Sequence, residues 1–219
     1  PDGSRFVTGG GMYNEVRIWD FASKKVTHTL NASGSSVSWS PNGLYIAAEV
    51  INSSSAVGKA RIFDANTGTE LALIEAGGEY YRVMQWSPDN RKIATVTMSG
   101  NSESYTNVWE VKSWTKLYSV GHPKNGIVRT VEWSPDSRQL LTTAYKNLSA
   151  ITWNASTGVK LKTLEIQSYV IDAHWSPDGS KIVTASMYDS LAIVWDSQKG
   201  TKLYELKHEN LKKLRIRAN

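Results

Sequence analysis

Histidines are the first residues to consider for chemistry, because an imidazole can act as a metal ligand or as a general base. The chain has four of them, and no two stand at the spacing of a metal-ligand pair: His28, His122, His174 and His208. It has no cysteine, so it can form neither a thiolate zinc site nor a cysteine nucleophile. We therefore predict no metal site, no cofactor and no catalytic histidine.

Two other patterns resemble chemical sites only at first sight. A glycine run spans residues 8–13 (TGGGMY), but it joins two strand-like stretches, which favours a hairpin over a phosphate-binding loop before a helix. Acidic residues recur singly in equivalent turns that are far apart in the sequence: Asp2, Asp89, Asp136 and Asp178. The sequence thus predicts that the protein is not an enzyme, and it indicates no small-molecule substrate.

Three short motifs recur five times in a constant order. The first is a Ser-Pro-Asp-Gly-like turn, whose prolines are about 40 to 47 residues apart: Pro1, Pro41, Pro88, Pro135 and Pro177. The second reads VRIWD, ARIFD, TNVWE, AITWN and AIVWD, and the third is a β-prone segment such as TKLYELK. Flanking stretches rich in Val, Ile and Thr are too short for helices, so each repeat predicts four short strands.

On these motifs the chain resembles the WD40-repeat family, whose four-stranded blades form a β-propeller. The resemblance implies an all-β protein that mediates protein-protein interaction as a scaffold. It also implies a buried hydrogen-bonded set of His, Ser or Thr, Asp and Trp in a blade. The fourth repeat matches this set with Asn in place of Asp: His122, Thr142, Asn147 and Trp153. Thr8, Thr95 and Thr184 occupy the hydroxyl position elsewhere, whereas Ala48 cannot bond there.

The chain begins within the turn of the first repeat, so this repeat is expected to have three strands and to lack its first. Residues 211–218 alternate apolar Leu214 and Ile216 with Arg215 and Arg217, as a half-exposed strand does. We expect this segment to complete the N-terminal blade and close a five-blade ring. The expected single domain, 1–219, would then contain blades at about 1–30 with 211–219, 31–76, 77–121, 122–166 and 167–208. The alternative is a piece of a larger propeller.

Partner-binding residues are expected where one repeat differs from the others. Two lengthened loops, 49–59 and 97–107, and two links between repeats, 76–82 and 121–129, should emerge on one face. Tyr and Arg are common binding hot spots. The predicted partner-binding residues are Tyr80, Tyr81, Arg82, Tyr105, Trp114 and Lys124. The alternative is that these are tolerated insertions whose aromatic residues pack locally.

The net charge of +5 comes mostly from the C-terminal residues 201–219. This offers a second class of partner, a nucleic acid bound through Lys212, Lys213, Arg215 and Arg217. The chain contains no apolar run of eighteen residues and opens without a charged-then-apolar leader. We therefore expect a cytoplasmic protein with another protein as its partner, nucleic acid as the alternative, and no membrane contact.

Overall fold

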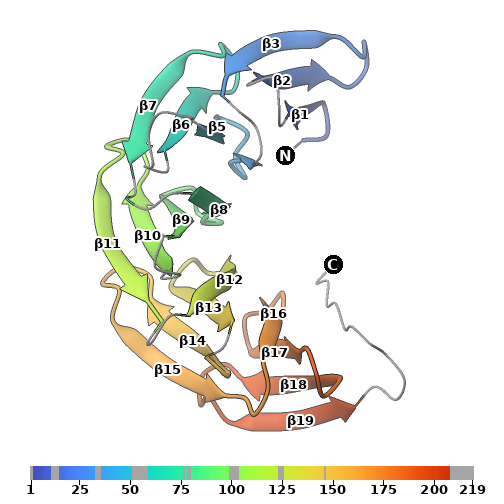
Figure 1. The fold of residues 1–219 in the computed structure, drawn as a ribbon. Helices are drawn as coiled ribbons and strands as arrows, with labels where there is room; N and C mark the ends of the chain where they lie inside the picture. The colour runs from blue at the N-terminus through green and yellow to red at the C-terminus, as the bar shows by residue number, and fades with distance from the viewer. Residues whose placement is uncertain are drawn as a thin grey trace. The chain divides into compact units, whose positions relative to one another are not determined.

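The structure is a computed structural model that describes residues 2–10, 15–32, 36–50, 59–75, 77, 80–98, 104–122, 126–145 and 147–207. Within these ranges it contains nineteen strands in five antiparallel sheets, so the all-β class is confirmed (Figure 1). The blade-like repeats are also present, because four of the sheets have four strands and the first has three. The predicted closing segment 211–218 lies outside the described residues.

Each repeat forms one sheet, in which consecutive strands are neighbours. The first sheet comprises β1 (Arg5–Gly10), β2 (Glu15–Asp20) and β3 (Val26–Asn31). The second comprises β4 (Val37–Trp39), β5 (Tyr45–Val50), β6 (Lys59–Asp64) and β7 (Glu70–Glu75). The third comprises β8 (Tyr80–Trp86), β9 (Lys92–Met98), β10 (Ser104–Glu110) and β11 (Lys116–Gly121).

The fourth sheet comprises β12 (Ile127–Trp133), β13 (Gln139–Tyr145), β14 (Ser149–Asn154) and β15 (Lys160–Glu165). The fifth comprises β16 (Val170–Trp175), β17 (Lys181–Ser186), β18 (Leu191–Asp196) and β19 (Lys202–Lys207). The chain divides into two compact units, Pro1–Gly100 with Asn107–Leu117 and Asn101–Thr106 with Tyr118–Asn219. The expectation of a single domain with the blade boundaries given above stays a prediction.

The apolar faces of consecutive sheets pack on each other, as the repeat pattern predicts. In the first unit, Ile18 and Leu30 of the first sheet are buried with Ile46 and Phe63 of the second. A second cluster in that unit joins the second sheet to Trp86 and Trp109 of the third. In the second unit, Leu141 and Leu164 are buried with Trp175, Ile182 and Trp195.

The Ser-Pro-Asp turns are built in the same way in successive sheets. The serine hydroxyl donates to Oδ1 of the turn Asp, as from Ser87 to Asp89 and from Ser134 to Asp136, both at 2.6 Å. The same hydroxyl accepts the backbone N–H of the residue that opens the next strand. The last turn residue has a positive φ, 60° at Asn90 and 61° at Ser137, which confirms the predicted turn conformation. The recurrent carboxylates of the described turns therefore serve the fold.

Candidate functional site

The structure places the predicted partner-binding residues in different settings. Tyr80, Tyr81 and Arg82 lie on β8, but their side chains are outside the described part of the chain, as is Lys124. Tyr105, on β10, is 44% exposed. The role of these four positions and of Tyr105 in partner binding stays a prediction.

Trp114 has an internal packing role. It stands at a turn position with φ of 56°, where two later repeats have Gly158 and Gly200. Its ring packs edge-to-face against Tyr45, at 5.4 Å between centroids, and against Trp86, at 6.3 Å. The side chain is thus partly buried beside the apolar cluster of the second and third sheets.

The room for Trp114 comes from a small residue on the preceding sheet. A Cβ added to Gly158 would lie 2.6 Å from the Tyr118 ring, and one added to Gly68 would lie 2.8 Å from the His28 ring. Tyr118 and His28 occupy the outer-strand position that Ala72 holds in the second repeat. Where the outer-strand residue is bulky, as Tyr118 and His28 are, the turn residue beside it is glycine. Where the outer-strand residue is the small Ala72, the turn residue is Trp114, and both pack against the same apolar cluster.

A Trp–Thr hydrogen bond recurs in four of the sheets. The indole Nε1 donates to the threonine hydroxyl in each case: Trp19 to Thr8 at 2.8 Å, Trp109 to Thr95 at 3.0 Å, Trp153 to Thr142 at 2.8 Å and Trp195 to Thr184 at 3.0 Å. In the second sheet both members are replaced, by Phe63 and Ala48. Joint replacement leaves no unpaired buried donor, which would cost more than the lost bond.

The fourth sheet extends this bond to histidine. His122 Nε2 lies 2.8 Å from the Thr142 hydroxyl. Burial lowers the pKa of His122 to about 4, so the imidazole is neutral at neutral pH. A Cβ on Gly126 would lie 2.2 Å from Asn147 Nδ2 and 2.9 Å from His122 Cβ, so this glycine lets the two side chains approach. His122 lies in the link between β11 and β12 and bonds Thr142 of β13, so the arrangement ties this link to the fourth sheet.

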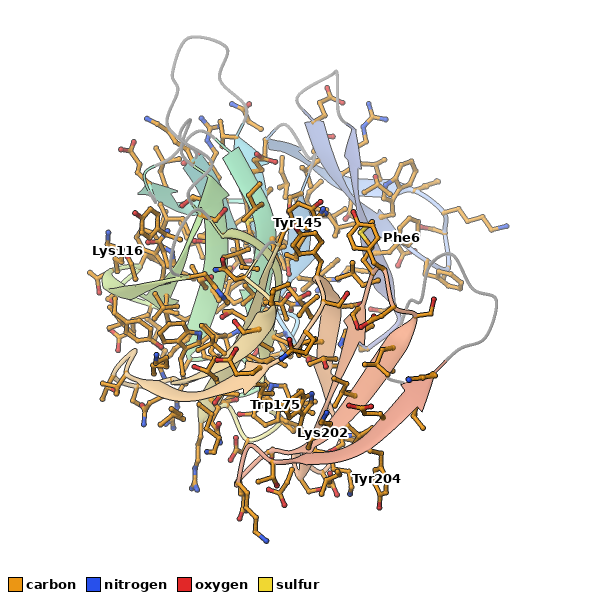
Figure 2. All side chains as sticks on the ribbon, turned by 60° about the horizontal axis from the view of Figure 1, so that its bottom comes forward. Phe6, Lys116, Tyr145, Trp175, Lys202 and Tyr204 are labelled. Atoms are coloured by element: carbon orange, nitrogen blue, oxygen red, sulfur yellow. The ribbon has the colours of Figure 1, made fainter. Side chains whose placement is uncertain are left out.

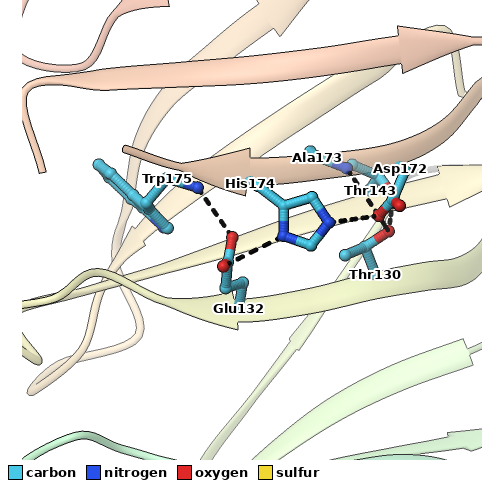
Figure 3. Close-up of polar contacts among 7 residues, drawn as sticks. All are labelled: Thr130, Glu132, Thr143, Asp172, Ala173, His174 and Trp175. Atoms are coloured by element: carbon cyan, nitrogen blue, oxygen red, sulfur yellow. Dashed lines mark hydrogen bonds and ion pairs between the residues drawn. The ribbon is translucent and has the colours of Figure 1, made fainter. Parts of the chain in front are cut away.

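A charged network links the edge strands β12 and β16 of the second unit (Figure 3). His174 lies between two carboxylates, with Nδ1 3.2 Å from Glu132 Oε1 and Nε2 3.3 Å from Asp172 Oδ1. The other Glu132 oxygen accepts the Trp175 backbone N–H at 2.9 Å. The carboxylate of Asp172 also accepts from the Thr130 hydroxyl at 3.4 Å.

This network holds His174 in its charged form. The hydrogen bonds to Asp172 and Glu132 raise its pKa to about 10, against the opposing effect of burial. A protonated imidazole whose two nitrogens both donate to carboxylates has no lone pair left to accept a proton. His174 is therefore an ionic link between two sheets rather than a general base.

Beside this network lies an arginine-tyrosine cluster, which we call the tyrosine surface: Arg129, Tyr145, Tyr169 and Tyr188. The Arg129 guanidinium lies 5.1 Å from the centroid of the Tyr145 ring. Tyr145 and Tyr169 are 5.0 Å apart between ring centroids, and Tyr169 and Tyr188 are 5.5 Å apart. Tyr145 pairs with Ile127 at the start of β12, whereas Trp175 is the last residue of β16. The two residues, both labelled in Figure 2, therefore lie at opposite ends of their sheets.

Backbone irregularities at this end orient the surface. The register of β12 against β13 shifts between Val128 and Thr130, which makes Arg129 the extra residue of a β-bulge. The register of β8 against β9 shifts around Arg82 in the same way. The backbone carbonyl of Tyr169 accepts the Met187 N–H at 2.9 Å, which fixes the link before β16 to the end of β17.

Sequence reasoning missed the tyrosine surface because its members come from segments that are far apart. The predicted link 121–129 includes Arg129, but the two predicted loops belong to the second and third repeats, whereas the three tyrosines come from the fourth and fifth. One signal was available: a tyrosine stands at or just after the end of the second strand in both of these repeats, in TTAYKN (Tyr145) and in TASMYDS (Tyr188). The charged network was missed for the same reason, since Glu132 and His174 belong to different repeats.

No metal site and no membrane span emerge from the described residues. Among them, no group of three or more His, Cys, Asp or Glu side chains could hold a metal ion. No helix long and apolar enough to cross a membrane is found in that part of the chain either.

Comparisons with known proteins give a family and a fold. Residues 52–215 match the family described as "Eukaryotic translation initiation factor eIF2A". No curated protein matches the chain. Among solved structures, the hydrazine synthase of Kuenenia stuttgartiensis is similar, with a TM-score of 0.68 and 14% identity over 91% of this chain. The alignment spans 63% of that structure's chain, and at this identity the likeness shows the fold alone.

Proposed function

The chain belongs to the eIF2A family of eukaryotic translation initiation factors, and from this we propose that it is a non-catalytic, propeller-type interaction module of the translation machinery. The observation that carries the proposal is the family match over residues 52–215. The proposed action lies in the cytoplasm, where translation takes place. The partner is a protein component of that machinery.

The distribution of polar groups supports a binding role. The turn carboxylates are held by serines, the buried hydroxyls by tryptophans, and His174 by two carboxylates. None of these groups is arranged to attack a substrate. Groups that differ between repeats, such as those of the tyrosine surface, are instead the kind that recognise partners.

Sedimentation in a eukaryotic cell-free translation extract tests the proposal. The tagged full chain is added before initiation, and the extract is separated on a sucrose gradient. We expect the chain to move with ribosomal subunits or initiation complexes, and to leave those fractions when initiation is blocked. A folded chain that stays at the top of the gradient under all conditions would contradict the proposal.

The ring architecture is the second part of the proposal. We propose that residues 211–218 complete the sheet of β1–β3, which has one strand fewer than the others, and so close a five-blade ring. A chain ending at Lys207 tests this. It should be markedly less stable or should aggregate, whereas a truncated chain that is monomeric and equally stable would rule out the strand assignment.

Nucleic-acid binding is a second candidate function, favoured by the charge of the C-terminal segment and compatible with a translation factor. It would use Lys212, Lys213, Arg215 and Arg217. Binding of a labelled RNA should then weaken steeply with salt and disappear when these four residues are replaced by glutamine. Unchanged binding by that variant would exclude the segment as the RNA site.

A further inference from the structure

Part of the tyrosine surface is exposed although the fold does not require it, whereas Tyr145 and Tyr169 are half-buried. Tyr188 is 68% exposed, and Arg129 is also exposed. Other exposed apolar side chains recur at one outer-strand position in successive sheets, as Leu117, Leu161 and Leu203 do. A recurring position reflects the architecture of the repeat, whereas the three tyrosines and Arg129 come together only where the fourth and fifth repeats meet.

Arg129 is ready to receive an anionic group. Among the described residues it has no ion pair, and its guanidinium is held over the Tyr145 ring by the β-bulge and the cation–π contact. A guanidinium offers donors in a planar fork that matches a carboxylate. Because the fork is already oriented, little rotamer freedom would be lost on binding.

The tyrosines supply the apolar part of such a site. Tyrosine buries a large ring at a low entropic cost, and its hydroxyl can bond a peptide group. The hydrogen bond with Tyr145 raises the pKa of the Tyr188 phenol above its ordinary value. Arg129 lies on β12 and Tyr145 on β13, and the Glu132–His174–Asp172 network joins β12 to β16 close to Arg129. Tyr169 and Tyr188 lie in the connections beside these strands.

We propose that the tyrosine surface binds an extended acidic peptide segment of a protein partner, with a carboxylate on Arg129 and an apolar side chain against Tyr188. This rests on the proposed role as an interaction module and specifies its partner class. The observations favour a peptide over RNA, since sequence-independent RNA binding needs several cations along a groove and Arg129 is the single cation among the described residues of this surface.

Fluorine NMR of the full chain labelled with 3-fluorotyrosine tests the inference. The probes are the peptides (Glu-Pro-Leu)4 and (Lys-Pro-Leu)4 and a uridine 12-mer. The acidic peptide should shift the Tyr145 and Tyr188 signals saturably, and the basic peptide should not. Arg129→Gln and Tyr188→Ala should each weaken binding by about tenfold, as expected for loss of a charge-assisted bond or an aromatic anchor.

Matched variants separate this site from general surface effects. Arg138→Gln and Tyr204→Ala change an exposed arginine and a 62% exposed tyrosine elsewhere, and they should leave the affinity unchanged. Tighter binding of the uridine 12-mer, equal binding of both peptides, or no shift with any probe would each overturn the inference. If the peptide fails but the chain still sediments with translation complexes, only the peptide site is wrong.

Discussion

Replacing Thr184 by valine removes one hydroxyl from the fifth sheet while keeping the shape of the side chain. Thr184 is 1% exposed and Trp195 is 5% exposed, and the indole donates to that hydroxyl at 3.0 Å. The substitution leaves the indole N–H buried without an acceptor, which costs about 1–3 kcal/mol of unfolding free energy. Guanidinium unfolding followed by circular dichroism measures the total, and hydrogen exchange of β17 and β18 locates it.

The second sheet provides the control, because it has Phe63 and Ala48 at the positions of Trp195 and Thr184. The double variant Thr184→Val with Trp195→Phe copies this pairing, and it should cost about 1 kcal/mol less than the sum of its single changes. Strict additivity of the two single changes would refute the argument.

Three further outcomes are expected. Trp114→Gly should destabilise the chain by about 1–3 kcal/mol, because lost aromatic packing outweighs the relief of a positive φ, and adding Ala72→Tyr should recover part of the loss in thermal unfolding. Gly126→Ala should cost about 1–3 kcal/mol by the same assay, since its methyl group would collide with Asn147; a neutral result would mean that the amide can move aside. His174→Gln should lower the free energy of unfolding most below pH 6.5, because the pKa of His174 is raised in the folded state and its contribution to stability is lost between pH 6.5 and about 10. Unfolding of both proteins across this pH range measures the effect, and a difference in unfolding free energy that does not change with pH would contradict it.

Repetition explains what could be predicted from the sequence. The Ser-Pro-Asp turns and the Trp–Thr positions recur, so each copy supports the interpretation of the others, and even Asn90 and Ser137 adopt the expected left-handed conformation. The packing of sheet on sheet follows from the same pattern, because each strand is apolar on the faces that neighbours must cover.

The candidate site could not be predicted in this way because it arises from differences between repeats. The contact between Glu132 and His174 depends on how two edge strands lie beside each other, which no local pattern specifies. The direction of Arg129 depends on a bulge, and a single extra residue in a ladder has no clear sequence signature. The unusual place of Trp114 in a turn predicts partner binding, and this stays a prediction; its packing could not be predicted because the complementary Ala72 lies in another repeat.

The match between Ala72 and Trp114 has a consequence for how such a chain could evolve. Each repeat carries at one end a shape that only a suitable predecessor can receive. Trp114 and Tyr118 both belong to the third repeat, so a tandem duplication of this repeat would force Trp114 of the second copy and Tyr118 of the first copy into one space. Placing the fourth repeat, which has Gly158, directly after the second, which has Ala72, would open a void. The contacts between neighbouring repeats thus depend on the order of the repeats, so one repeat cannot replace another without a loss of packing.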